Sequence, residues 1–287
     1  MIYYFLTALG LVGFLFSSVT DIKSREIPDW LSYSLIIAGL GLRLLFSISE
    51  NEYTLILFGL VGFGIFFALA HLFYFLRLWG GGDAKLLMVT AALFSTYPNY
   101  ENISFLWGFL FNLLLIGSVY NLVWAFVLLI KNYDKFKTEF WNLLKHDKFK
   151  KYQKYYLVLA LVILVFAIII QDSSLRLTLI ILFAVLLVYH YFHILIKAVD
   201  HIGMYKNIKV SELTEGDWVA KNIYINKKLI ASPKDLGLTK KQINILKKSA
   251  ILKIQIKQGV PFAPAFLITL IVTLVLGNLA NLIIYLK

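Results

Sequence analysis

Two aspartates lie at the ends of neighbouring apolar segments, and both have the chemistry of a general acid or base. Asp83 follows Gly80, Gly81 and Gly82 and opens one apolar segment, whereas Asp21 closes the first apolar segment of the chain. A carboxylate at the edge of a membrane span is costly, so it is a candidate functional group. Glycine has no Cβ, so we expect a sharp turn here and close approach by another part of the chain.

Two carboxylates that share a proton can hydrolyse a peptide bond. The ionised group takes a proton from the attacking water, and the protonated group donates its proton to the carbonyl oxygen. Asp83 is predicted at a helix N-terminus, where the helix dipole favours negative charge, and Asp21 at a helix C-terminus, where it does not. Our hypothesis is that Asp83 is the base and Asp21 the acid at the start of turnover.

Each polar residue of these segments also has a structural interpretation. Asp83 is of a type that often caps a helix, and Asp21 is of a type that anchors a span by pairing with Lys23 or Arg25. The two aspartates at matching ends of their spans, with glycines before one of them, favour catalysis. Lys85 is expected to orient a substrate carbonyl or Asp83, or to extend to the membrane surface.

The composition is that of a protein with several membrane spans. Of the 287 residues, 60% are hydrophobic and 15% are charged, whereas soluble domains are about 45–50% apolar and about 25% charged. The chain has no cysteine, which excludes disulfides, cysteine–zinc sites and thiol nucleophiles. The N-terminus begins on an apolar run, so we expect a retained span and not a removed signal peptide. No cofactor or metal is expected.

Eight apolar segments are expected to form transmembrane helices: about 2–20, 30–48, 54–76, 84–97, 104–130, 155–170, 175–199 and 261–286. A span needs about 20 residues, and the fourth segment is shorter than that. Either its helix begins before the glycines, or Asp83 lies below the membrane surface. Asp29, after Pro28, is expected to cap the second span, and Arg43, near its outer end, to extend to the membrane surface.

The charged connections predict the orientation of the chain. Segment 131–154 has eight lysines and three acidic residues, and segment 200–258 has twelve lysines and five acidic residues. The positive-inside rule places 21–29, 77–85, 131–154 and 200–258 in the cytoplasm and both termini outside. Because lysine-rich loops beside spans set topology more often than they bind nucleic acid, no nucleic-acid partner is expected despite the net charge of +12.

Five regions are predicted: a catalytic membrane core (1–130), a basic interfacial cytoplasmic loop (131–154), spans six and seven (155–199), a small cytoplasmic domain (200–258) and the last span (259–287). Phe136, Phe140, Leu143 and Leu144 share one helix face. That face suits an interfacial helix on anionic lipid or a solvated helical hairpin equally well.

Segment 200–258 has the pattern of a small α+β domain. A turn at 215–217 is followed by a predicted strand over 218–225 and a second turn at 226–228. Thr239 and Gln242 form a capping-box pattern at the start of a short helix, and 251–257 alternates as a half-buried strand does. The predicted fold is therefore an all-α polytopic membrane protein of about eight transmembrane helices, with a small α+β cytoplasmic domain inserted before the last helix.

Two motifs resemble a known family. The stretch from Gly80 to Leu86 resembles the GxGD-x-K-L motif of the type IV prepilin peptidases, and Asp21 followed by Ile27-Pro28-Asp29 resembles their first catalytic aspartate and I-P-N/D sequence. The similarity covers roughly residues 1–130. The lysine-rich insert and the 259–264 lead-in to the last span are similar to the archaeal branch, the preflagellin and archaeal prepilin peptidases.

The resemblance implies an aspartic endopeptidase that removes a short basic leader peptide from pilin-like or archaellin precursors at the cytoplasmic membrane face. It implies that Asp21 and Asp83 are the catalytic pair, supported by Gly80, Gly82 and Lys85. Besides these precursors, membrane lipids are the expected partners.

Some features depart from the family pattern or leave other functions open. Bacterial members often have a paired-CxxC segment and an N-methyltransferase activity, and the lack of cysteine and of room before Asp21 predicts a peptidase without methylation. The segments 155–170 and 175–199 are additional to the family pattern, so the resemblance does not identify the precursor. The alternatives are a presenilin-like intramembrane protease and a proton-coupled transporter, which would favour carboxylates near the bilayer midplane and paired repeats.

Overall fold

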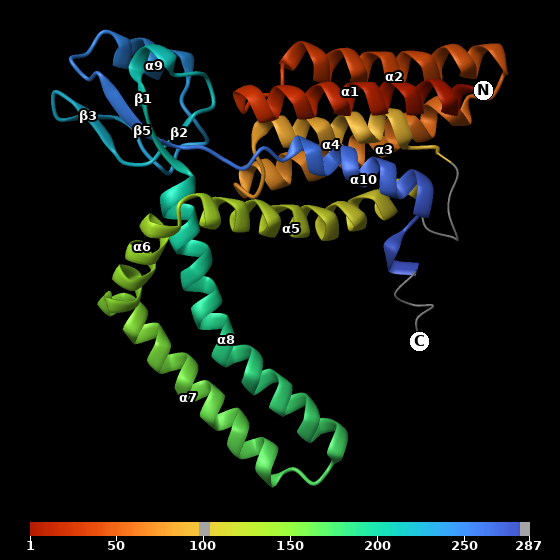
Figure 1. Cartoon of the computed structure of the whole chain (residues 1–287). Helices are drawn as coiled ribbons and strands as arrows, with labels where there is room; N and C mark the ends of the chain where they lie inside the picture. Colours follow the sequence, from red (N-terminus) through yellow and green to blue (C-terminus); the bar gives the residue numbers. More distant parts are fainter. Residues whose placement is uncertain (98–103, 282–287) are drawn as a thin grey trace. The chain divides into compact units, whose positions relative to one another are not determined.

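The computed structural model describes residues 1–97 and 104–281 (Figure 1), without the side chains of Lys148 and His190. It divides into two compact units. The first contains residues 1–123 and 208–287, and the second contains residues 124–207.

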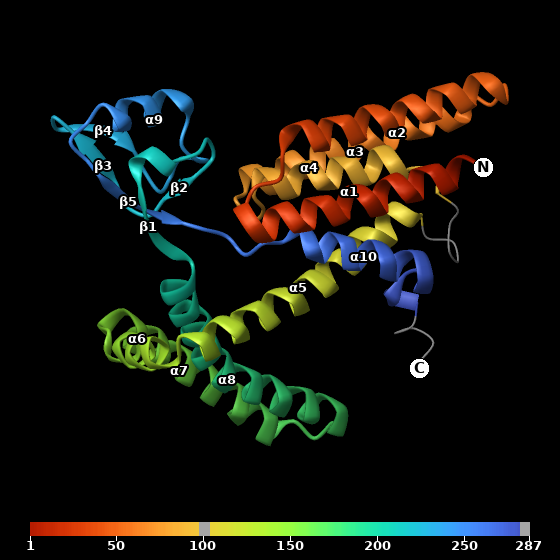
Figure 2. The same cartoon turned by 45° about the horizontal axis from the view of Figure 1, so that its top comes forward.

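The first unit contains a bundle built around one short helix. The bundle helices are α1 (Ile2–Ser24), α2 (Asp29–Ser49), α3 (Thr54–Phe75), α4 (Gly81–Phe94) and α10 (Ala263–Leu276), and α5 (Phe105–Lys131) begins in this unit. Helix α4 contacts α1, α2, α3 and α10, and these helices lie side by side in Figures 1 and 2. Nearly every side chain from Ala84 to Phe94 is buried. The helix that carries Asp83 is therefore the centre of the bundle.

Small residues allow the helices to approach α4 closely, as is common for helices packed in membranes. A Cβ atom added at Gly10 would lie 2.7 Å from the ring of Phe94, and one added at Gly39 would lie 3.0 Å from the carbonyl oxygen of Ala92. Both contacts are too tight for a larger residue without movement of the neighbours. Glycines in α1 and α2 therefore fix the spacing around α4.

Within residues 1–97 and 104–281, six helices are long and apolar enough to cross a membrane, and the predicted count of eight is not confirmed. They are α1, α2, α3, α5, α7 (Asp147–Ile169) and α8 (Ser173–Gly203). Helices α4 and α10 have 14 residues each, about 21 Å at 1.5 Å per residue, whereas the hydrocarbon core is about 30 Å thick. The fourth and eighth predicted spans are thus short helices, although 282–286 of the last one lies outside the described residues.

Helix α10 ends early because the chain breaks at Gly277, where φ is 73°. Asn112 on α5 compensates for this break: its Nδ2 donates to the carbonyl oxygen of Gly277 (2.9 Å), and its Oδ1 accepts from the N–H of Leu279 (3.0 Å). Nδ2 also donates to Oγ1 of Thr273 (3.0 Å). Backbone groups in a membrane need partners inside the protein, and this one side chain supplies them.

Arg43 does not extend to the membrane surface, so that prediction was wrong. It is fully buried; Nε donates to the carbonyl oxygen of Ala92 (2.9 Å), Nη2 to that of Leu93 (2.8 Å), and Nη1 to Oγ1 of Thr96. The last carbonyls of a helix lack partners within the helix and favour a cation nearby. Arg43 therefore caps the end of α4, and Gly59 on α3 leaves room for it.

A small α+β insert precedes α10, as the sequence predicts. Its sheet has the order β1 (Tyr205–Lys209), β5 (Lys253–Lys257), β2 (Trp218–Val219), and β3 (Ile223–Ile225) and β4 (Lys228–Ala231) form a hairpin. β2 pairs antiparallel to β5, with Trp218 opposite Lys257. Helix α9 (Lys240–Lys247) completes the insert, with η1 (Val210–Glu212) beside it.

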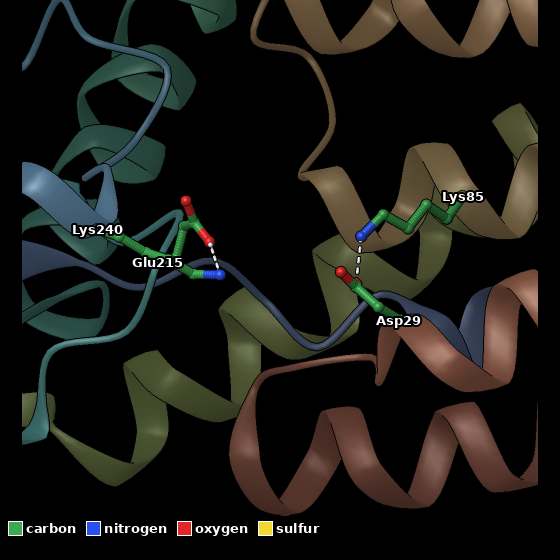
Figure 3. Close-up of polar contacts among 4 residues, drawn as sticks. All are labelled: Asp29, Lys85, Glu215 and Lys240. Atoms are coloured by element: carbon green, nitrogen blue, oxygen red, sulfur yellow. Dashed lines mark hydrogen bonds and ion pairs between the residues drawn. The ribbon is translucent and has the colours of Figure 1, made fainter.

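The local signals in the insert are confirmed with one exception. Asn226 and Lys227 form the hairpin turn with φ of 48° and 63°, as a two-residue hairpin loop requires. The Thr239–Gln242 capping box is present, and Lys240 pairs with Glu215 at 3.4 Å (Figure 3). The predicted strand over 218–225 is instead two strands, β2 and β3, because residues 220–222 between them belong to neither strand.

The second unit contains α6 (Tyr133–Lys145), α7 and α8. The predicted apolar face of α6 packs inside the protein: Leu143 forms a buried cluster with Phe149 of α7 and Ile194 and Ala198 of α8, and Phe136, Phe140 and Leu144 pack against it. This face is thus covered, at least at Leu143, by the unit's own helices.

Candidate active site

Asp21 lies in the last turn of α1 and is buried, with 7% of its surface exposed. Its Oδ2 accepts a hydrogen bond from the backbone N–H of Ala263 at 2.9 Å. Ala263 is the first residue of α10. The side chain at the end of the first helix is thus held by the beginning of the last one.

Asp83 is the third residue of α4 and is half-buried. Its Oδ2 accepts a hydrogen bond from the backbone N–H of Gly80 at 3.2 Å. The carbonyl oxygen of Gly80 accepts from the N–H of Ala84 at 3.1 Å. Asp83 therefore has the capping geometry that the sequence offers as an alternative, but this uses only one of its two oxygens.

The two carboxyl groups have matching arrangements. Each has one oxygen, Oδ2, bound to a backbone N–H at the start of a helix. Asp21 is close enough to Asp83 for its charge to act on that group. Like charges in one site titrate as a pair and share a proton. A carboxyl pair that shares one proton can activate water with its ionised member and protonate a carbonyl with the other.

The position of α10 weakens the hypothesis that Asp83 is the base and Asp21 the acid. Asp21 lies at the C-terminus of α1, but it also accepts an N–H from the N-terminus of α10. Helix N-termini favour negative charge, so both aspartates now have that environment. The helix-dipole argument no longer distinguishes acid from base.

The two sequence motifs are in direct contact. A Cβ atom added at Gly82 would lie 3.1–3.3 Å from side-chain atoms of Ile27. Lys85 pairs with Asp29, the first residue of α2 (Figure 3), and lies 5.7 Å from the ring centre of Tyr33. The Ile27-Pro28-Asp29 stretch is therefore docked on the glycine motif, and Lys85 joins α4 to α2 instead of pairing with Asp83.

The glycines serve close approach and not a sharp turn. None of Gly80, Gly81 and Gly82 has a positive φ, and Gly80 lies in the extended region with φ of −71°. The left-handed residue that turns the chain is Arg77, with φ of 58°. The expectation of close approach is confirmed at Gly82, and the expectation that these glycines make the turn was wrong.

Sequence reasoning missed the groups that α10 and its lead-in bring to Asp21. Arg25, the left-handed cap of α1, donates from Nη1 to the carbonyl oxygen of Gly259 at 3.0 Å. Burial lowers the pKa of Arg25, and the nearby charge of Asp21 opposes that shift. Ala263 is 242 positions from Asp21, so no local spacing pattern could have predicted the pairing. Within the described ranges, no cluster of three His, Asp or Glu side chains could hold a metal ion.

Comparison with known proteins identifies the matching part of the chain. Residues 8–128 match the type IV leader peptidase family. The chain is similar to a preflagellin peptidase of Methanococcus voltae (36% identity; 33% of this chain and 42% of the relative) and to one of Methanocaldococcus jannaschii (38% identity; 31% and 38%). It is also similar to a prepilin peptidase of Methanothermobacter thermautotrophicus (28% identity; 34% and 26%).

These matches span less than half the length of each of these three relatives. The matched segment of the family contains both Asp21 and Asp83, whereas the α+β insert and α10 lie beyond it. The resemblance that the two aspartate motifs predict is confirmed, since residues 8–128 match the type IV leader peptidase family.

Proposed function

We propose that this protein is a membrane aspartic endopeptidase that removes the short basic leader peptide from pilin-like or archaellin precursors. The observation that carries the proposal is the docking of the two motifs, through Ile27 on Gly82 and Asp29 on Lys85, with each aspartate held by a backbone N–H at the start of a helix. The family match over the same residues and the preflagellin peptidase relatives support the choice of substrate.

In the proposed reaction the pair begins with one proton. The ionised carboxylate accepts a proton from water as the water oxygen attacks the scissile carbonyl carbon, and the protonated carboxyl gives its proton to the carbonyl oxygen. The resulting gem-diol then collapses: the leaving nitrogen takes a proton, the C–N bond breaks, and a carboxylic acid and an amine are released. One proton remains on the pair, ready for the next turnover.

The precursor is proposed to meet the pair from the cytoplasmic side. The lysine-rich segments 131–154 and 200–258 support that orientation by the positive-inside rule, with both termini outside. The apolar helix of the precursor would lie in the membrane, while its extended leader junction reaches the aspartates. Because the chain has no cysteine, we propose peptidase activity without methylation.

One alternative fits the geometry less well, and the other differs in the position of the cut. A proton-coupled transporter favours carboxylates near the bilayer midplane, whereas Asp21 and Asp83 lie in the last turn of one helix and the first turn of another. A presenilin-like protease would use the same pair to cut within the apolar helix of its substrate. The position of the cut distinguishes that activity from leader removal.

Replacing each aspartate by asparagine tests the proposal. Asp21→Asn and Asp83→Asn, co-expressed with an archaellin or pilin precursor, should each abolish the size shift of the precursor, a loss of at least about a hundredfold for an acid–base group. Asp172→Asn, which alters an exposed helix cap in the second unit, is the matched control and should process normally. Normal processing by either site variant would reject the assignment, and mass spectrometry of the product would locate the cut.

A further inference from the structure

The segment Gly259-Val260-Pro261-Phe262-Ala263 joins β5 of the insert to α10, and we name it the strap. Both of its ends are bonded to the end of α1: Arg25 Nη1 donates to the Gly259 carbonyl oxygen (3.0 Å), and the Ala263 N–H donates to Asp21 Oδ2 (2.9 Å). Ala263 is fully buried. The strap therefore holds the Asp21 carboxyl group in one orientation.

Phe262 connects the strap to the other half of the site. Its ring lies 6.1 Å from that of Trp79, the residue directly before Gly80, and 6.4 Å edge-on from that of Tyr120 on α5. Only 9% of Phe262 is exposed. The ring fills a notch at Gly117, where an added Cβ atom would lie 2.6 Å from it. One side chain thus packs against α5 and against the lead-in to the Asp83 motif.

Tyr120 adds a polar group at the same place. It lies on α5 within electrostatic range of both Asp21 and Arg25, and its ring contacts Phe262. Groups near Asp21 thus come from α1, α4, α5 and the strap, and of these four the strap lies outside the segment that matches the family.

We infer that the strap positions the reacting groups: Ala263 orients Asp21 through its N–H, and Phe262 in the Gly117 notch fixes the distance between the strap and the Gly80–Asp83 motif. The inference rests on the proposed function, since it assigns positioning residues to that reaction. Placement errors of about 1 Å can cost about a hundredfold in rate. A displaced strap should therefore lower kcat, while the precursor still binds.

Filling the notch tests the role of Phe262. Gly117→Ala should displace the Phe262 ring and lower kcat about tenfold or more, with KM changed less than about twofold. Gly64→Ala on α3 makes the same change where no atom lies within 4 Å and should leave both constants unchanged. The double variant Gly117→Ala/Phe262→Leu makes room for the new methyl group and should recover most of kcat, which a general loss of folding would not do.

A measurement without turnover tests the role of Ala263. In full-length protein labelled with ¹⁵N-alanine, the Ala263 amide resonance, assigned by an Ala263→Ser variant, should shift as the pH is varied. The Ala263 resonance should no longer shift with pH in Asp21→Asn, because the amide donates to the carboxyl group that this variant removes. Gly117→Ala should also move this resonance, and Gly64→Ala should not.

The outcomes separate the two proposals. Any of three results would overturn the strap inference. They are equal rates for Gly117→Ala and Gly64→Ala, a double variant that is no faster than Gly117→Ala, and an Ala263 resonance that is the same with and without the Asp21 carboxyl group. If wild-type protein cuts no precursor while the resonance behaves as expected, the strap assignment stands and the proposed function fails.

Discussion

At the scale of one residue, the position of Lys85 could be read from the sequence, but its partner could not. Its place two positions after Asp83 is evident, but three roles fit that spacing equally well. The structure selects another partner, Asp29, which lies 56 positions away. Asp29 is 67% exposed, so the ion pair contributes at most about 1 kcal/mol to stability. The ion pair mainly joins the two motifs.

A double-mutant cycle distinguishes positioning by Lys85 from direct contact with substrate. If Lys85 acts through Asp29, then Lys85→Met and Asp29→Asn should lower kcat/KM by similar factors, and the double variant should be no slower than either. Cleavage rates of a purified precursor provide the measurement. A slow Lys85→Met beside a normal Asp29→Asn would instead indicate that Lys85 touches the substrate.

Gly82 yields a second prediction at this scale. Gly82→Ala should force Ile27 away, because the new Cβ would lie 3.1 Å from it, whereas Gly81→Ala meets only a Tyr74 ring atom at an ordinary 3.7 Å. We expect Gly82→Ala to lower both activity and the thermal midpoint, and Ile27→Val to restore part of the loss. Equal midpoints for the two alanine variants would show that the contact tolerates a methyl group.

At the scale of elements, the sequence predicted most helices and the local structure of the insert, because periodicity, caps and turns are local signals. Its fourth and eighth predicted spans correspond to α4 and α10, which have 14 residues each, because hydropathy does not distinguish a helix buried among helices from one that crosses a membrane alone. It also placed Arg43 at the surface. The acceptors that hold Arg43 are the end carbonyls of α4, 49 and 50 positions away, and no sequence window contains both.

Arg43 should therefore be a stability determinant of α4. Arg43→Met leaves the carbonyl groups of Ala92 and Leu93 buried without their donor, at about 1–3 kcal/mol for each unsatisfied group. Arg176→Met, on an exposed turn of α8, is the matched control and should change the midpoint little. Thermal unfolding in detergent measures both variants, and equal midpoints would mean that other donors replace the guanidinium.

At the scale of the whole molecule, the family resemblance covers the aspartate-bearing helices but not α6 to α8, the insert or α10. The charge pattern predicts which connections face the cytoplasm. The aspartate motifs could be predicted from the sequence because each is contiguous. The contribution of the strap could not, because its contacts with Asp21 and Trp79 depend on the complete fold.

The orientation can be measured directly, because the chain has no cysteine to remove. Asn51→Cys, between α2 and α3, should react with a membrane-impermeant maleimide on intact cells. Lys241→Cys, an exposed position of the insert, should react only after the cells are opened. The reverse pattern would place the aspartates on the outer side and contradict the proposed topology.

The 242 positions between Asp21 and its hydrogen-bond donor also have a consequence for biosynthesis. A ribosome that has released α1 to α5 into the membrane has already made both acidic side chains, but the backbone amide that orients the first of them has yet to be translated. Under the proposed function, the aspartate pair would therefore be incompletely oriented until α10 has been translated and has packed against α1.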